Sequence, residues 1–228
     1  VGTTAHSPWR FLFFFFSNQI PRNCVKGLRS LAKGEGVTLF TVLLSAYYVL
    51  LNRYTTQSDI VVGSPMAGRT TVESEDCCGY FVNPVALRAD LGGNPSFRNL
   101  VARVRQIVLD ALVHQGMPFP RLVEKLQPTR DASRTPFFQT MFVLQKPHHF
   151  GDEGLAMYFV NRANVTMQMG DLTFESMDIG QRHSQFDLSL MMAESKDDLV
   201  ASFHYNTKLF DRRTIESFAS HFETLLQS

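Results

Sequence analysis

Histidine and cysteine are the side chains whose spacing would reveal acid–base, nucleophilic or metal chemistry in this chain. The seven histidines are scattered except for the adjacent pair His148 and His149. Cys77 and Cys78 are adjacent, and Cys24 stands alone. The sequence has no Cys/His spacing typical of zinc ligation and no GxGxxG, Walker A, GxSxG or HExxH motif. We therefore expect no metal site, no disulfide framework and a reducing, cytoplasmic setting.

A few polar residues stand out because of their surroundings. Asn83 follows an apolar run within residues 79–84, and a buried asparagine needs partners, so it is either a structural clamp or a substrate contact. Asp187 precedes an apolar strand, where an ion pair or turn cap is favoured over catalysis. His114 stands at a predicted helix end, where it can pair with the last carbonyls and the helix dipole. Residues 130–136 predict a charged surface turn.

Apolar periodicity predicts the helices that must position these residues. A helix over residues 38–54 has almost no polar face, so it should be central and buried. Ser96 and Asp211 are of the type that caps helix N-termini. The predicted helices span residues 24–33, 38–54, 97–114, 120–126 and 212–226.

Short apolar or alternating segments predict the strands. They occupy residues 9–16, 59–63, 81–89, 138–145, 155–160, 172–179, 186–193 and 199–205. A turn is expected at 18–23, and loops are expected at 64–69 and 70–76. Strands and helices mixed without strict βαβ alternation predict an α/β protein with a mixed β-sheet packed with helices.

Composition narrows the functional classes. The 228 residues are 44% hydrophobic and 19% charged, with a net charge of +1, which excludes wholesale disorder and disfavours nucleic acid as a partner. The aromatic run at 11–16 is far shorter than the roughly 20 residues needed to cross a bilayer, so no membrane is expected. Twenty Phe against one Trp and six Tyr indicate a large interior or an apolar face awaiting a partner.

Three segments, in this order, resemble motifs of the condensation domain of nonribosomal peptide synthetases. Residues 79–88, from Gly79 to Arg88, read GYFVNPVALR and resemble a GxFVNT-type motif. Residues 114–120 read HQGMPFP and resemble HQDxPFE, with Gly and Pro in place of Asp and Glu. Residues 130–136 read RDASRTP and resemble RDxSRNP. Residues of these motifs, together with Asp187, are expected to hold the fold together: Gly79, Arg88, His114, Arg130, Asp131, Ser133, Arg134, Pro136 and Asp187.

The resemblance implies a chloramphenicol-acetyltransferase-like lobe, two of which form a V around a tunnel. The family reaction joins a donor acyl thioester to the amine of an acceptor aminoacyl thioester, both tethered by phosphopantetheine on carrier domains. No cofactor is then bound directly. The implied partners are the N-terminal lobe, the donor and acceptor carrier domains and a neighbouring adenylation domain. Phe11, Phe13 and Phe15 are expected to pack at the lobe junction.

The family's HHxxxDG motif lies upstream of all three motifs, in the N-terminal lobe. Residues 1–228 are therefore expected to be the C-terminal lobe, without a catalytic residue and inactive alone. His148 and His149 begin an HHxxxDG-like string with Glu153 in place of Asp, but they follow residues 130–136, so we interpret them as a surface loop.

The tunnel wall is expected to include Ser64, Asn83, Phe142, Gln145, Ser184 and Gln185. Segments 142–147 and 186–194 resemble members of mixed polyketide–peptide assembly lines, so a polyketide-type donor is one possibility. An epimerisation or heterocyclisation relative, or a non-catalytic carrier-docking module, stays open as an alternative. A free-standing acyltransferase would need its own catalytic histidine.

Overall fold

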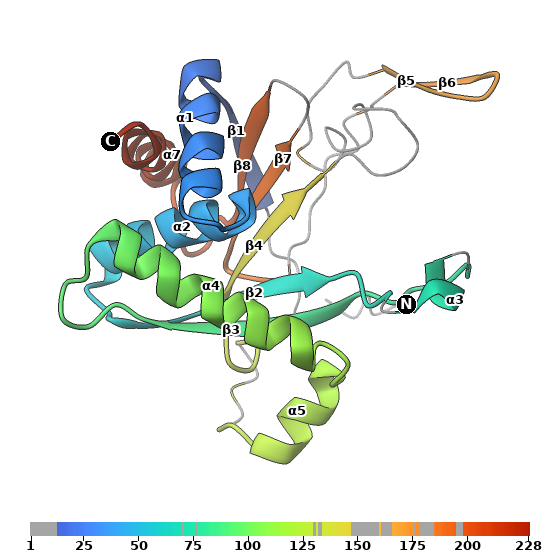
Figure 1. The fold of residues 1–228 in the computed structure, drawn as a ribbon, viewed down its shortest axis with the longest axis horizontal. Coiled ribbons are helices and arrows are strands. Elements are labelled where there is room, and N and C mark those ends of the chain that lie inside the picture. The colour runs from blue at the N-terminus through green and yellow to red at the C-terminus, as the bar shows by residue number, and fades with distance from the viewer. Residues whose placement is uncertain are drawn as a thin grey trace, which may run out of the picture.

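A six-stranded mixed sheet forms the centre of the molecule, with strand order β1-β8-β7-β4-β2-β3 (Figure 1). The computed structural model describes residues 13–69, 71–75, 77–129, 131, 134–146, 160, 166–175, 177, 185–194 and 198–228. The strands of the sheet are β1 (Phe13–Ile20), β2 (Asp59–Met66), β3 (Asn83–Asp90), β4 (Thr140–Gln145), β7 (Leu188–Glu194) and β8 (Leu199–Asn206). A separate hairpin is formed by β5 (Thr166–Met169) and β6 (Leu172–Glu175).

The strand directions confirm the predicted mixed sheet. β4 runs parallel to β7 and, at a single pair joining Gly63 to Met141, parallel to β2. The outer pairs β1–β8, β8–β7 and β2–β3 are antiparallel. The sheet therefore has a parallel centre and antiparallel margins.

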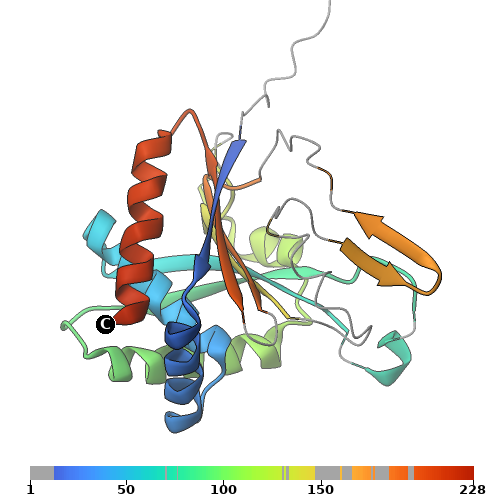
Figure 2. The same cartoon turned by 90° about the horizontal axis from the view of Figure 1, so that it is seen from above.

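Four helices cover one face of this sheet, as Figure 2 shows from above. They are α1 (Arg22–Gly34), α2 (Leu39–Thr55), α4 (Phe97–His114) and α7 (Arg212–Gln227). The short helices α3 (Val72–Glu75) and α5 (Phe119–Leu126) lie away from this layer. Helix α2 is the predicted central helix, since eleven of its residues are buried.

Side-chain caps fix where the long helices begin. The Ser96 hydroxyl accepts a hydrogen bond from the Asn99 amide, and the Asp211 carboxylate accepts one from the Thr214 amide, as their types predict. Thr38 caps α2 in the same way by accepting from Thr41. These caps satisfy amide groups that have no partner inside the helix.

Alternating side chains give the sheet two different faces. The face toward the helices, here called the helix-covered face, belongs to one large cluster that includes the fully buried Val62, Phe142, Leu190 and Met192. The opposite face, here called the second face, carries two small clusters. One contains Phe138, Met141 and Val143, and the other contains Val160, Ala193 and Val200.

Several predicted boundaries were wrong because strand pairing overrode local signals. β1 continues through Ile20, where a turn was expected, because residues 17–20 pair with β8. β2 continues through Met66, where a loop was expected, because residues 64–66 pair with β3. The loop expected at 70–76 contains α3, and β5 was not predicted.

Other predictions are only partly described. β6 accounts for residues 172–175 of the strand expected at 172–179. Val160 lies in a turn, and the rest of the strand expected at 155–160 lies outside the described residues.

Within the described residues, no single helix is long and apolar enough to cross a membrane. Helices α1 and α2 would pass such a test only as a pair, and they are bent by 108° relative to each other.

Candidate functional site

Three aromatic rings bring separate sequence segments together on the second face. Phe119 begins α5, Phe138 precedes β4 and Phe186 precedes β7. The ring centroids of Phe119 and Phe138 are 5.3 Å apart, and those of Phe138 and Phe186 are 5.5 Å apart. The motif at 114–120, the motif at 130–136 and the segment leading to Asp187 therefore meet around Phe138.

Gly63 makes room for this aromatic cluster. A Cβ atom at position 63 would lie 2.2 Å from the Phe138 ring. Position 63 is also the single residue of β2 that pairs with β4. Glycine is thus required where the two central strands and the aromatic ring approach most closely.

Asn83 is a clamp on the turn between α4 and α5. Its amide nitrogen donates to the carbonyl oxygens of Gln115 and Met117, at 2.9 and 2.8 Å. Its amide oxygen accepts from the Phe119 amide at 3.0 Å. Both N–H groups and the oxygen are thus used within the chain, which favours the structural alternative for this residue.

Arg88 pairs with Asp59 across β2 and β3. Its guanidinium reaches both carboxylate oxygens of Asp59, at 2.8 and 2.6 Å. The hydrogen bonds from Arg88 lower the pKa of the Asp59 carboxyl. Both side chains are exposed, so this pair positions the strand margin more than it stabilises the fold.

Asp187 and Arg134 lie near each other at the start of β7. Burial raises the pKa of the Asp187 carboxyl, and the charge of Arg134 opposes that rise. Arg134 also contacts Asp131, with 3.6 Å between Nε and Oδ2. The backbone of Asp187 joins two elements, since its N–H donates to Gln139 and its carbonyl accepts from Asn206.

The remaining motif residues have simpler environments. His114 is exposed at the end of α4, and its carbonyl accepts from the Met117 amide. The Pro136 carbonyl accepts from the Phe138 amide at 2.9 Å. Arg130 and Ser133 lie outside the described residues.

Arg69 organises the segment that carries α3, a role that the sequence analysis missed. Its guanidinium donates to the carbonyl oxygens of Ser74, Cys77 and Gly79. The same guanidinium lies 4.5 Å from the centroid of the Phe81 ring. The sequence signal that could have indicated this role is the Gly68–Arg69 pair in a predicted loop. Gly68 has φ +68°, and a side chain at position 68 would lie too close to the Phe81 carbonyl oxygen.

Five of the six residues expected along a tunnel wall lie in the described part of the chain, and they fall into three groups. Ser64 is buried, and its hydroxyl donates to the Phe142 carbonyl at 2.9 Å. Phe142 is also fully buried, against Phe40 and Tyr47 of α2. Both belong to the helix-covered face and are inaccessible in this structure, so substrate contact through them stays a prediction.

Gln145 and Gln185 are accessible. Gln145 is half-buried at the end of β4, on the same face as Met141 and Val143, and Gln185 is exposed. Asn83, already described, forms the third group. Ser184, His148 and His149 lie outside the described residues, as do Phe11 and the side chains of Phe13 and Phe15.

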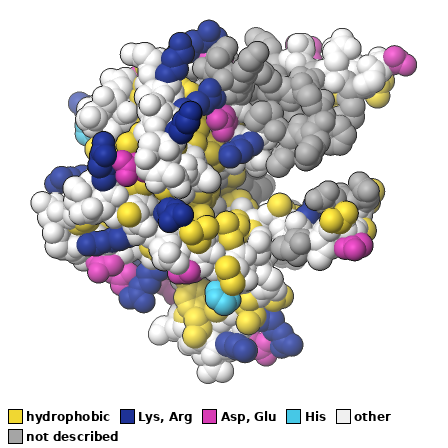
Figure 3. All heavy atoms as spheres, in the orientation of Figure 1, with side chains coloured by type: hydrophobic (Ala, Val, Ile, Leu, Met, Phe, Trp, Pro, Cys, Tyr) yellow, Lys and Arg dark blue, Asp and Glu magenta, His cyan; other side chains and the backbone are white. Residues whose placement is uncertain are grey.

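Two projections extend from the molecule on the side away from the helices (Figures 1 and 2). One is the segment around α3, where Val72 is 78% exposed and Tyr80 is 87% exposed. The other is the β5–β6 hairpin, followed by Met177, which is also 78% exposed. Figure 3 shows hydrophobic side chains on the surface of the α3 projection. Large exposed apolar side chains on two neighbouring projections are typical of a contact surface.

The described part of the chain offers binding surfaces more than acid–base chemistry. It contains no group of three or more His, Cys, Asp or Glu side chains that could hold a metal ion. His204 on β8 is largely buried, and burial lowers its pKa to about 4. The His204 imidazole is therefore neutral at neutral pH, as is expected of a buried histidine within a sheet.

Comparisons with known proteins agree with the sequence motifs. A family model described as "Condensation domain" matches residues 16–228. A linear gramicidin synthase of Brevibacillus parabrevis is 41% identical over 216 residues, which are 92% of this chain and 4% of that protein. Tyrocidine synthase 3 of the same organism is 40% identical over 203 residues, which are 89% of this chain and 3% of that protein. The chain thus spans only a small part of such relatives.

Solved structures share the fold. A holo four-domain nonribosomal peptide synthetase bound to AMP and glycine superposes with a TM-score of 0.85 at 26% identity, over 96% of this chain and 17% of that chain. The condensation domain from a Monacolin K polyketide synthase gives a TM-score of 0.75 at 19% identity, over 99% of this chain and 49% of that one.

Proposed function

Because this chain belongs to the condensation-domain family, we propose that it is the C-terminal lobe of a domain that forms amide bonds in a nonribosomal peptide synthetase. The coverage of 49% of a condensation domain supports this proposal, since one lobe is about half of a two-lobe domain. In the proposed reaction the acceptor amine attacks the donor thioester carbonyl. The C–N bond forms, the C–S bond breaks, the donor phosphopantetheine thiol leaves and the amine loses a proton.

The role proposed for this lobe is positioning. Holding two tethered reactants in near-attack geometry can lower a barrier by roughly 7–11 kcal/mol. In this proposal the present lobe supplies tunnel walls and docking surfaces, and the general base is supplied by the N-terminal lobe. The single observation that carries the assignment is the meeting of three segments on the second face: Phe119 of the motif at 114–120 and Phe186, next to Asp187, both contact Phe138, which follows the motif at 130–136. The proposed partners are the N-terminal lobe, two phosphopantetheine-bearing carrier domains and an adenylation domain.

The N-terminal lobe is proposed to contact the two apolar projections. Their exposed apolar side chains would then be buried in the complete domain. Replacing Val72 or Tyr80 by Asp should weaken association of the two separately produced lobes at least about tenfold, because a carboxylate would be buried without a partner. Val113 on α4 is equally exposed, at 78%, so Val113→Asp is the matched control.

Activity provides the test of function. The purified chain is mixed with donor and acceptor carrier domains, with and without the N-terminal lobe, and the amide product on the acceptor carrier is measured by intact-protein mass spectrometry. We expect product only when both lobes are present. Turnover by this chain alone that is lost in His149→Ala would overturn the proposal, and carrier binding without turnover by the joined lobes would favour a docking module.

A further inference from the structure

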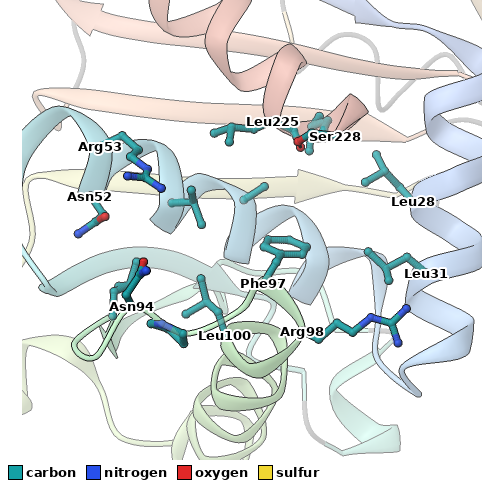
Figure 4. A pocket seen from close by; sticks show the side chains of 15 residues that line it. Leu28, Leu31, Asn52, Arg53, Asn94, Phe97, Arg98, Leu100, Leu225 and Ser228 are labelled. Atoms are coloured by element: carbon teal, nitrogen blue, oxygen red, sulfur yellow. The ribbon is translucent and has the colours of Figure 1, made fainter.

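The helix layer contains a hollow that takes no part in the proposed reaction. It has a volume of about 500 Å³ and lies between α1, α2, α4 and α7, on the side of the sheet away from the second face (Figure 4). Binding pockets for small molecules commonly measure roughly 300–1,000 Å³. We call it the helix pocket; it is lined by Leu28, Leu31, Ala46, Val49, Asn52, Arg53, Leu91, Asn94, Pro95, Phe97, Arg98, Leu100, Leu225, Leu226 and Ser228.

Most of the lining is aliphatic or aromatic. Leu28 and Leu31 come from α1, Leu225 comes from α7, and the Phe97 ring at the start of α4 lies between them in Figure 4. Phe97 remains 37% exposed. An aromatic ring that is left open to solvent inside a hollow gains stability when an apolar group covers it.

One end of the helix pocket is polar. Asn52, Arg53 and Asn94 gather there, as Figure 4 shows. The Asn52 amide nitrogen is held by the Gln57 carbonyl at 2.7 Å, and Asn94 has a left-handed backbone with φ +48°. Arg53 is exposed, and within the part of the chain that the structure describes it forms no ion pair with a carboxylate.

The other arginine of the helix pocket behaves differently. Arg98 donates to the Glu35 carboxylate at 2.9 Å, so its charge is compensated. The two ends therefore differ, with an uncompensated cation at the Arg53 end and a neutralised pair at the Arg98 end. A ligand with one anionic head and an apolar body matches this polarity.

We propose that the helix pocket binds an amphiphilic carboxylate, with the carboxylate at Arg53 and the aliphatic body over Phe97, Leu31 and Leu225. Charge-assisted hydrogen bonds from a guanidinium to a carboxylate give the head its preference. A bound ligand would contact four helices at once, so it would raise the unfolding temperature of the chain. This site lies on the opposite side of the sheet from the Phe138 cluster.

The test uses decanoate as the probe and the full 228-residue chain. Methyl NMR spectra should show shifts of Leu28, Leu31, Val49 and Leu225, with no shifts of Met141 or Val143 on the second face. Arg53→Gln should weaken decanoate binding about tenfold or more, as expected for loss of a charge-assisted hydrogen bond. Decan-1-ol, which lacks the carboxylate, should bind the wild type and Arg53→Gln equally and weakly.

Two further variants sharpen the result. Val49→Phe should fill the hollow and abolish binding, whereas Arg105→Gln, on the exposed side of α4, should bind decanoate as the wild type does. The proposal fails if Arg53→Gln binds decanoate with unchanged affinity, if Val49→Phe still binds, or if binding occurs only above the micelle concentration of the probe.

Discussion

On the helix-covered face, side chains such as Leu190 and Met192 are sealed by helices of the same chain. On the second face, the intervening positions Ser189 and Met191 meet small clusters and polar groups. The Ser17 hydroxyl donates to the Val160 carbonyl and is also hydrogen-bonded to the Ser202 hydroxyl, and the Ser202 side chain is fully buried. The helix-covered face is thus a closed hydrophobic core, whereas the second face also contains buried, hydrogen-bonded polar groups such as the Ser202 hydroxyl. The comparison predicts that the helix-covered face contributes more to stability than the second face does.

Neighbouring residues of β7 give the largest test of this difference. Leu190→Ala removes a fully buried side chain from the large cluster and should reduce the free energy of unfolding by about 3 kcal/mol. Met191→Ala, one position along on the second face, should cost about 1 kcal/mol because its side chain is only partly buried. Urea unfolding of both variants measures the difference. An equal or greater loss for Met191→Ala would remove the distinction between the faces.

Gly63 tests the most tightly packed point of the second face. Gly63→Ala should destabilise the chain by about 2 kcal/mol, because the new methyl group overlaps the Phe138 ring. The change Phe138→Leu, added to Gly63→Ala, should recover part of that loss in thermal unfolding. Gly27→Ala is the control, since a Cβ there has nothing within 4 Å and lies in α1. It should stabilise the chain by roughly 0.5–1 kcal/mol. A neutral Gly63→Ala would contradict the packing described here.

Asn83 tests the connection between the two faces, because it ties α4 of the helix layer to α5 of the Phe138 cluster. Asn83→Ala should cost roughly 1–2 kcal/mol, since the carbonyls of Gln115 and Met117 lose their donor. Hydrogen exchange should rise at the Phe119 amide and stay unchanged in β8. Unchanged exchange at Phe119 would show that the turn holds without the clamp.

His204 tests the polar interior of the second face through pH. Burial lowers its pKa from 6.5 to about 4, so the folded chain keeps the imidazole neutral while the unfolded chain protonates it first. Stability from this source is complete above pH 6.5 and is lost as the pH falls toward 4. At pH 5 the loss relative to pH 7 should be roughly 1–2 kcal/mol, and His204→Gln should lack it. An NMR titration of the His204 ring that gave a midpoint near 6.5 would be evidence against a buried imidazole.

The sequence predicts this molecule best where the interactions are local. The apolar run of α2 and the capping types of Ser96 and Asp211 lie within single elements, and the structure confirms them. The end of β2 was missed because Ser64 and Pro65 are typical loop residues, and only pairing with β3 makes them a strand. β5 was missed because it is only four residues long, so the alternation of Met167 and Met169 with polar residues is too short to mark a strand.

The candidate site shows the same limit. Asn83 was open to two interpretations because its partners lie more than 30 residues away along the chain. Ser64 and Phe142 are hydrogen-bonded neighbours, but no local pattern shows that both face the helices, and their contact with substrate stays a prediction. The motif resemblance identified the family, and the packing of its residues needed the three-dimensional structure.

The sheet joins the first described strand to the last one, since Phe13 pairs with Asn206 and Ile20 with Leu199. On the ribosome, β1 therefore emerges long before β8, its partner among the described strands. At about 5–20 residues per second, it waits about ten to forty seconds with its hydrogen-bonding groups unpaired. An aromatic strand in that state is a template for aggregation. The yield of folded chain should consequently depend on chaperones that bind nascent segments, and slowing synthesis before β8 should lower it.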